Sequence, residues 1–151
     1  MRARRYNPRV GSKPQTIVDL TWLGGLTFAA TSGDATITLD SAGAAGPSPV
    51  QTLGIALAGC MAMDVAHILT RSRHVFHALT AHLVADRAAD DPRRIVRVAI
   101  RFAVEGNVPT DAVERAIALS RETYCSVWHS MRQDIAFETS AQVVGGREPS
   151  S

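Results

Sequence analysis

The chain has 151 residues, of which 46% are hydrophobic and 20% charged, a composition typical of one globular domain. A chain of this length buries roughly 70% of the surface that its unfolded form exposes, so it needs no metal or disulfide to fold. Its net charge is +2, and its two cysteines are too few for a secreted disulfide scaffold, which favours a reducing, cytoplasmic compartment.

The positive charge is concentrated in residues 1–15, which carry five basic residues and no acidic one. These are Arg2, Arg4, Arg5, Arg9 and Lys13. A basic arm can bind nucleic acid, but this one has a single aromatic residue and the rest of the chain has no matching motif. We therefore expect a solvated, poorly ordered terminus and no nucleic-acid partner. The arm also lacks the apolar segment of a secretory signal.

Three short strands are predicted over residues 16–22, 26–31 and 35–40, which are rich in β-branched residues. Gly24-Gly25 and Ser32-Gly33-Asp34 are the turn signals between them. The pattern predicts a β-meander.

A long helix is predicted from Ser48 to about Arg71. Ser48 and Gln51 have the spacing of a capping box, and a proline follows the cap. The helix is apolar on nearly every side, so we expect a second helix and a partner subunit to cover it. Only about eleven residues are continuously apolar, which predicts a buried core helix and no membrane span.

The second half predicts two strands, two helices and a last strand. Residues 78–85 and 94–105 are strand-like, and the second alternates between an apolar face and a polar face, which suits an antiparallel sheet. The apolar face consists of Val96, Val98, Ile100, Phe102 and Val104.

A helix is predicted from Thr110 toward Cys125, then a short helix to Met131, and a strand over residues 134–143. The order βββ-α-ββ-αα-β predicts an α+β fold. We place a single domain at residues 16–144 and a polar tail at residues 145–151.

Cys60 and Cys125 are the candidate functional residues, and two interpretations remain open. Both thiols lie in helical patterns, and they either form a dithiol redox site or are inert small residues of the core. Cys60 lies in the middle of its helix, so reactivity there requires a cation from elsewhere in the fold.

Two further side chains have helical spacing to the thiols. Asp64 follows Cys60 by four residues and would oppose thiolate formation, and His129 follows Cys125 by four residues and can pair with it. No Cys/His pair has zinc spacing and no phosphate-binding loop is present, so we expect no metal and no cofactor.

The residues around both cysteines resemble the OsmC/Ohr family, the osmotically inducible and organic hydroperoxide resistance proteins. The resemblance spans residues 16–144 and is strongest in residues 46–65 (GPSPVQTLGIALAGCMAMDV) and 116–127 (AIALSRETYCSV), with residues 22–28 (WLGGLTF) fitting the early strands.

This resemblance implies an intertwined α+β homodimer with a long central cysteine-bearing helix. It implies that Cys60 attacks a small organic hydroperoxide and that Cys125 resolves the product as a disulfide. A dithiol reductant then restores both thiols.

The chain departs from the family pattern at two charged positions. The family's Arg and Glu, which support the reactive thiolate, are replaced here by Leu26 and Val50, with Gln51 next to the latter. We therefore keep Gln51, Asp64 and His129 as supporting residues. The alternative is a non-catalytic dimer of the same fold that binds a small apolar ligand at its interface.

Overall fold

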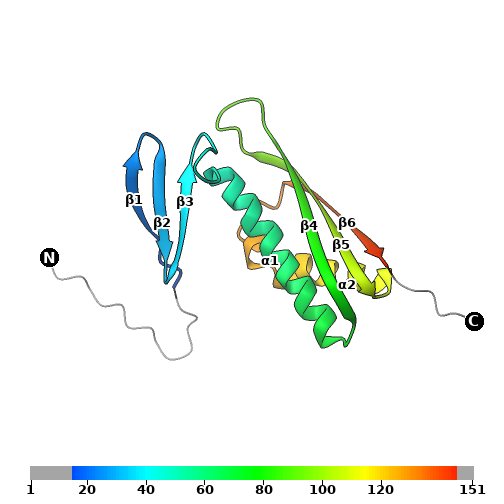
Figure 1. Ribbon diagram of the computed structural model, residues 1–151. Coiled ribbons are helices and arrows are strands. Elements are labelled where there is room, and N and C mark those ends of the chain that lie inside the picture. Colours follow the sequence, from blue (N-terminus) through cyan, green and yellow to red (C-terminus); the bar gives the residue numbers. More distant parts are fainter. Residues whose placement is uncertain (1–14, 146–151) are drawn as a thin grey trace, which may run out of the picture. The chain divides into compact units, whose positions relative to one another are not determined.

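A computed structural model describes residues 15–145, and the chain divides into two compact units, residues 1–51 and residues 52–151 (Figure 1). The fold is mixed α+β, and the elements follow the predicted order βββ-α-ββ-αα-β with one addition, a π-helical turn between the last two helices. The predicted basic arm and polar tail lie almost entirely outside the described residues. The single domain at residues 16–144 stays a prediction.

The first unit contains the predicted antiparallel meander, in the order β1-β2-β3. Its strands are β1 (Asp19–Gly24), β2 (Thr27–Ser32) and β3 (Ala35–Asp40). Gly24 and Gly25 have positive φ angles of 113° and 55°, a backbone conformation that favours glycine. The pairing gathers apolar side chains on one face of this sheet, namely Leu20, Trp22, Phe28, Ala30, Ile37 and Leu39.

The predicted capping box begins helix α1 (Pro49–Arg71). The Gln51 N–H donates to Ser48 Oγ at 3.2 Å, and the Ser48 N–H donates to Gln51 Oε1 at 2.9 Å. These two bonds satisfy backbone donors that a helix start otherwise leaves unpaired.

Helix α1 buries one stripe of side chains and leaves much of its apolar surface open. Leu57, Met61, Val65 and Leu69, spaced four apart, are fully buried. By length and composition the helix is apolar enough to cross a membrane, and 22% of its most apolar window is buried. The surface that the chain leaves uncovered is the part for which a partner subunit was expected.

The second unit is built on a three-stranded sheet in the order β4-β5-β6. Its strands are β4 (Val75–Arg87), β5 (Ile95–Asn107) and β6 (Ala136–Val144). The expectation of a purely antiparallel sheet is wrong for the last strand, because β6 pairs parallel to β5. The helices between β5 and β6 make the long crossover that a parallel pair needs.

The alternating pattern of β5 is present with one irregularity. Val98, Ile100, Phe102 and Val104 are buried as predicted, whereas Val96 is half-buried. The register shifts there, since Asp86 opposes Arg97 while Arg87 opposes Ile95. This bulge turns Ile95 into the core in place of Val96.

Helix α2 (Thr110–Leu119) completes the core of this unit with four buried residues, namely Ala112, Val113, Ala116 and Ile117. Further along, Trp128 stacks on Phe137 of β6 with ring centroids 4.4 Å apart, and the Arg121 guanidinium lies 4.7 Å from the same phenyl ring. These contacts fasten the segment that carries Cys125 to the sheet.

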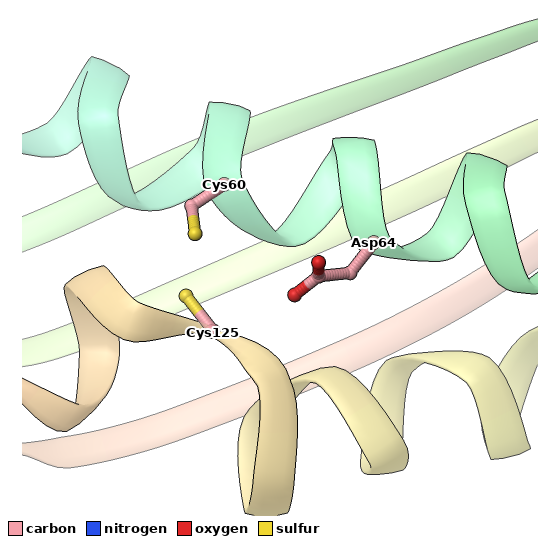
Figure 2. Close-up of side chains that lie close together, drawn as sticks. All are labelled: Cys60, Asp64 and Cys125. Atoms are coloured by element: carbon pink, nitrogen blue, oxygen red, sulfur yellow. The ribbon is translucent and has the colours of Figure 1, made fainter. Parts of the chain in front are cut away.

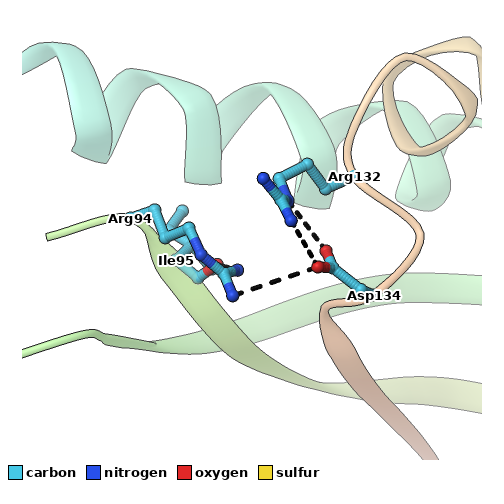
Figure 3. A network of polar contacts seen from close by, with 4 residues as sticks. All are labelled: Arg94, Ile95, Arg132 and Asp134. Atoms are coloured by element: carbon cyan, nitrogen blue, oxygen red, sulfur yellow. Dashed lines mark hydrogen bonds and ion pairs between the residues drawn. The ribbon is translucent and has the colours of Figure 1, made fainter. Parts of the chain in front are cut away.

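An ionic cluster lies where the chain enters β6 (Figure 3). Asp134 accepts two hydrogen bonds from Arg132, one of them 2.9 Å from Nε, and its carboxylate lies 3.9 Å from the Arg94 guanidinium. The hydrogen bonds from Arg132 lower the pKa of Asp134 to about 2. Arg94 precedes β5, so the cluster links the starts of the two parallel strands.

Candidate functional site

Helix α1 supplies the first half of the site. Cys60 and Asp64 are one helical turn apart, so their side chains project from the same face, as the spacing predicted. Both side chains are half-buried. The face therefore presents a thiol and a carboxyl group together.

A π-helical turn supplies the second half. The turn η1 (Ser120–Tyr124) directly follows α2, and the Cys125 N–H donates to the Ser120 carbonyl oxygen at 2.8 Å. Cys125 then caps the short helix α3 (Ser126–His129), and its sulfur accepts the Trp128 N–H at 3.4 Å. A π-helical turn is wider than an α-helical one, and the regular helix ends here at Cys125, whose backbone is extended.

The two halves meet in one cluster (Figure 2). The two sulfur atoms and a carboxylate oxygen of Asp64 all lie within 4.8 Å of one another. Ser120 Oγ donates to Asp64 Oδ2 at 2.7 Å, and Ser126 Oγ lies 3.9 Å from the Cys60 sulfur. The side chains of Cys60, Asp64 and Cys125 converge on the same space from α1 and from the turn before α3.

The two thiols differ in environment. Cys125 has no exposed surface, whereas Cys60 is half-buried. Burial raises the pKa of the Cys125 thiol to about 11, the Trp128 N–H opposes this rise, and the neighbouring Cys60 sulfur adds to it. Cys125 is therefore a protonated thiol at neutral pH, with its sulfur within 4.8 Å of the Cys60 sulfur.

A cationic partner for the thiols is missing from the described part of the chain. Between residues 15 and 145, no hydrogen bond or ion pair joins either sulfur to an Arg, Lys or His side chain. The His129 side chain is exposed and makes no such contact, although its backbone is helical as expected. Gln51 acts in the capping box of the first unit.

Ser120 and Ser126 are site residues that the sequence analysis did not find. Ser120 is fully buried and Ser126 follows Cys125 directly. Ser120 is the first residue of the π-helical turn, and its hydroxyl group reaches Asp64, which lies 56 positions away in the sequence. The only local signal was the run of polar residues at 120–123 inside an otherwise amphipathic helix.

The sequence of this chain matches known proteins over most of its length. A family model described as OsmC-like protein matches residues 41–140. Protein YhfA of Escherichia coli strain K12 is 33% identical over 126 residues, which make up 82% of this chain and 94% of that protein.

Solved structures share the fold. A hypothetical protein from Aquifex aeolicus VF5 matches with a TM-score of 0.81 at 26% identity, covering 87% of this chain and 97% of that chain. An OsmC-like protein from Mycoplasma pneumoniae matches with a TM-score of 0.73 at 14% identity, covering 88% and 98%. An organic hydroperoxide resistance protein OsmC from Legionella pneumophila matches with a TM-score of 0.67 at 17% identity, covering 87% and 99%.

Proposed function

Because this chain belongs to the OsmC-like protein family, as its cysteine motifs predicted, we propose that it is a thiol-dependent redox protein that reduces small organic hydroperoxides with Cys60 and Cys125. The observation that carries the proposal is the approach of the two sulfur atoms to within 4.8 Å. To form a disulfide, the two sulfur atoms must approach to about 2.05 Å, which is at most about 2.8 Å closer than here.

The unequal burial of the thiols supports different roles for them. Cys60 is half-buried, so a substrate can reach its sulfur, whereas Cys125 is enclosed and stays protonated. Cys60 is therefore the attacking thiol and Cys125 the resolving one. This agrees with the roles that the family resemblance implies.

The chemistry takes two steps and balances with an external reductant. The Cys60 thiolate attacks the distal peroxide oxygen, the O–O bond breaks, and the products are a Cys60 sulfenic acid and, after protonation, an alcohol. The Cys125 sulfur then attacks the Cys60 sulfur, forming the disulfide and releasing water. A dithiol reductant returns two electrons and two protons by thiol–disulfide exchange.

The polar groups bonded to Cys60 and Asp64 in the described residues are hydroxyl groups. Ser126 Oγ approaches the Cys60 sulfur and Ser120 holds Asp64, while the family's Arg and Glu positions carry Leu26 and Val50. Neutral donors stabilise a thiolate less than a guanidinium does. We therefore expect turnover to be slow.

The test is the fate of the two thiols when reduced protein meets one equivalent of cumene hydroperoxide. We expect the free thiol count to fall from two to zero and the mass to fall by two hydrogens. In Cys125→Ser the reaction stops at a sulfenic acid that dimedone traps on Cys60, and Cys60→Ser keeps its remaining thiol. Two thiols that survive long exposure at neutral pH refute the proposal.

The missing cation also supports a second candidate, a non-catalytic dimer that binds a small apolar ligand at its interface. With no cationic side chain among residues 15–145 bonded to the Cys60 sulfur, the thiols act as small core side chains, and Leu26 and Val50 make the family's charged positions apolar. Native mass spectrometry of the purified protein separates the candidates, because this one predicts a co-purified lipid or aromatic ligand together with unreactive thiols.

Exposed apolar surface supports a homodimer under both candidates. On α1, Ile55 and Met63 are 61% and 74% exposed, and on the apolar face of the first sheet Trp22 is 64% exposed. Patches of this kind on a soluble protein are typical of subunit interfaces. We propose that a second copy of the chain covers them and that the protein is soluble and cytoplasmic.

Light scattering during size-exclusion chromatography tests the assembly. We expect a mass of two chains for the native protein and a shift toward one chain for Met63→Glu, because the substitution places a charge in the interface. The control Thr80→Glu adds the same charge at an exposed strand position and should remain dimeric. A native protein that elutes with the mass of one chain contradicts the proposed dimer.

A further inference from the structure

We propose that the reduced protein binds one Zn²⁺ ion per chain between the Cys60 thiolate, the Cys125 thiolate and the Asp64 carboxylate. This site goes beyond the redox proposal and does not depend on it, because it requires only the reduced thiols. The fold brings the three residues together, although their spacing in the sequence matches no zinc motif.

The separation of the ligand atoms suits a single small ion. Zinc binds sulfur at about 2.3 Å and carboxylate oxygen at about 2.0–2.2 Å, which places tetrahedral ligands roughly 3.5–3.8 Å apart. The three atoms here lie within 4.8 Å of one another, so each must move by about 1 Å or less toward a common centre. The side chains already converge from two segments of the chain (Figure 2).

The charges of the cluster favour a cation. Two thiols and a carboxyl group share this space, and no Arg, Lys or His side chain among residues 15–145 is bonded to the sulfurs. Thiolates are disfavoured in the free protein because little positive charge lies near them. A bound ion supplies that positive charge itself and so favours the thiolates. Binding releases the two thiol protons to solvent and forms two Zn–S bonds.

Neighbouring groups orient the ligands. Ser120 donates to Asp64 Oδ2 at 2.7 Å, which holds the carboxylate and leaves its other oxygen available. The Trp128 N–H donates to the Cys125 sulfur, and thiolate ligands in metal sites commonly accept such bonds. Because Cys60 and Asp64 are half-buried, water has access to the fourth position.

The probe for this site is Co²⁺, which takes zinc geometry and gives intense ultraviolet bands when thiolates bind it. Anaerobic titration of reduced, EDTA-treated protein should give thiolate-to-cobalt bands that saturate at one ion per chain and disappear when Zn²⁺ is added. Protein alkylated with iodoacetamide should give none.

Four variants and one control test the ligands and the residue that orients Asp64. Cys60→Ser and Cys125→Ser should lose the thiolate bands of a two-sulfur site. Asp64→Asn removes a charged ligand and should weaken binding at least about tenfold. Ser120→Ala should weaken binding by a similar factor, because the loss of an orienting partner commonly costs 10–100-fold in affinity. The control is Asp134→Asn, because the Asp134 carboxylate is bonded to Arg132 and is not one of the proposed ligands. This variant should bind the ion as the native protein does.

The absence of thiolate bands in the native protein overturns the proposal, and so do bands that are unchanged in Cys60→Ser or in Asp64→Asn. A protein that binds the ion but does not react with hydroperoxide supports the metal site and refutes the redox function. A protein that reacts with hydroperoxide but gives no thiolate bands refutes only the metal site.

Discussion

The Ser120 hydroxyl donates a 2.7 Å hydrogen bond to Oδ2 of Asp64, although the two residues are 56 positions apart in the chain. This bond ties the π-helical turn before Cys125 to the face of α1 that carries Cys60. Among the residues that the structure describes, it is shorter than the other side-chain contact between α1 and the segment around Cys125, since the Cys60 sulfur and Ser126 Oγ lie 3.9 Å apart.

Ser120→Ala should therefore destabilise the protein by about 1–3 kcal/mol, since a partly buried carboxyl group loses its donor. Urea denaturation followed by circular dichroism measures the change. Ser140→Ala, at an exposed position of β6, is the matched control and should change the free energy of unfolding by less than about 0.5 kcal/mol. Equal effects of the two substitutions contradict a structural role for the Ser120 bond.

The thiols should react with iodoacetamide in a fixed order. With a pKa of about 11, roughly one Cys125 thiol in three thousand is ionised at pH 7.5, and its sulfur has no exposed surface. Cys60 is half-buried, so we expect Cys60 to be alkylated first at neutral pH and Cys125 only slowly, with a rate that rises up to about pH 11.

Peptide mass spectrometry of samples quenched over time gives both rates. In urea the two thiols should react at similar rates, because the difference comes from the fold. If Cys125 reacts as fast as Cys60 in the native protein, its assignment as the protected, resolving thiol is wrong.

Acid should remove the stabilisation that Asp134 provides. Arg132 lowers its folded-state pKa to about 2, below the usual value of 3.8, so the folded state binds fewer protons than the unfolded state between these values. The contribution is fully present above about pH 4–5 and is lost as the pH falls toward 2. Asp134→Asn should lower the melting temperature at pH 7 and have little effect near pH 2.

Differential scanning calorimetry at pH values from 7 to 2 measures this convergence. Asp34→Asn, in the exposed turn between β2 and β3, is the control. A constant difference between native protein and Asp134→Asn across the range excludes the ionic contribution.

The stacked pair of Trp128 and Phe137 should control how well Cys125 is enclosed. Phe137→Ala removes a buried ring that contacts both Trp128 and the Arg121 guanidinium, which should cost about 3–5 kcal/mol. Arg121→Ala removes only the cation, at about 0.5–1 kcal/mol. In Phe137→Ala the alkylation of Cys125 should also become faster. An unchanged rate would show that the stacked rings do not protect the thiol.

Much of the fold could be predicted from local sequence patterns. The capping box at Ser48 and Gln51 formed with both hydrogen bonds, and the alternating residues of β5 from Val98 onward are buried. These features depend on neighbours within a few positions, so the sequence contains them directly. The OsmC-like family and fold, inferred from the residues around Cys60 and Cys125, are confirmed by the family match.

The predictions from sequence were wrong or incomplete where contacts between residues far apart in the chain decide the structure. The direction of β6 depends on the crossover through α2, and the bulge at Val96 depends on the register with β4. The π-helical turn at Ser120–Tyr124 and the bond between Ser120 and Asp64, 56 positions apart, were not predicted from local patterns. The Cys60–Asp64 face was predicted from helical spacing, but its meeting with Cys125 required the family resemblance.

The positions of the two cysteines have a consequence for how strongly the molecule resists unfolding. A bridge between their sulfurs would close a loop of roughly 65 residues that holds β4, β5 and α2. Restricting the unfolded chain to such a loop contributes about 4 kcal/mol at 25 °C in the chain-entropy description. Oxidation would thus stabilise the fold against heat and proteases, and reduction would remove this stabilisation.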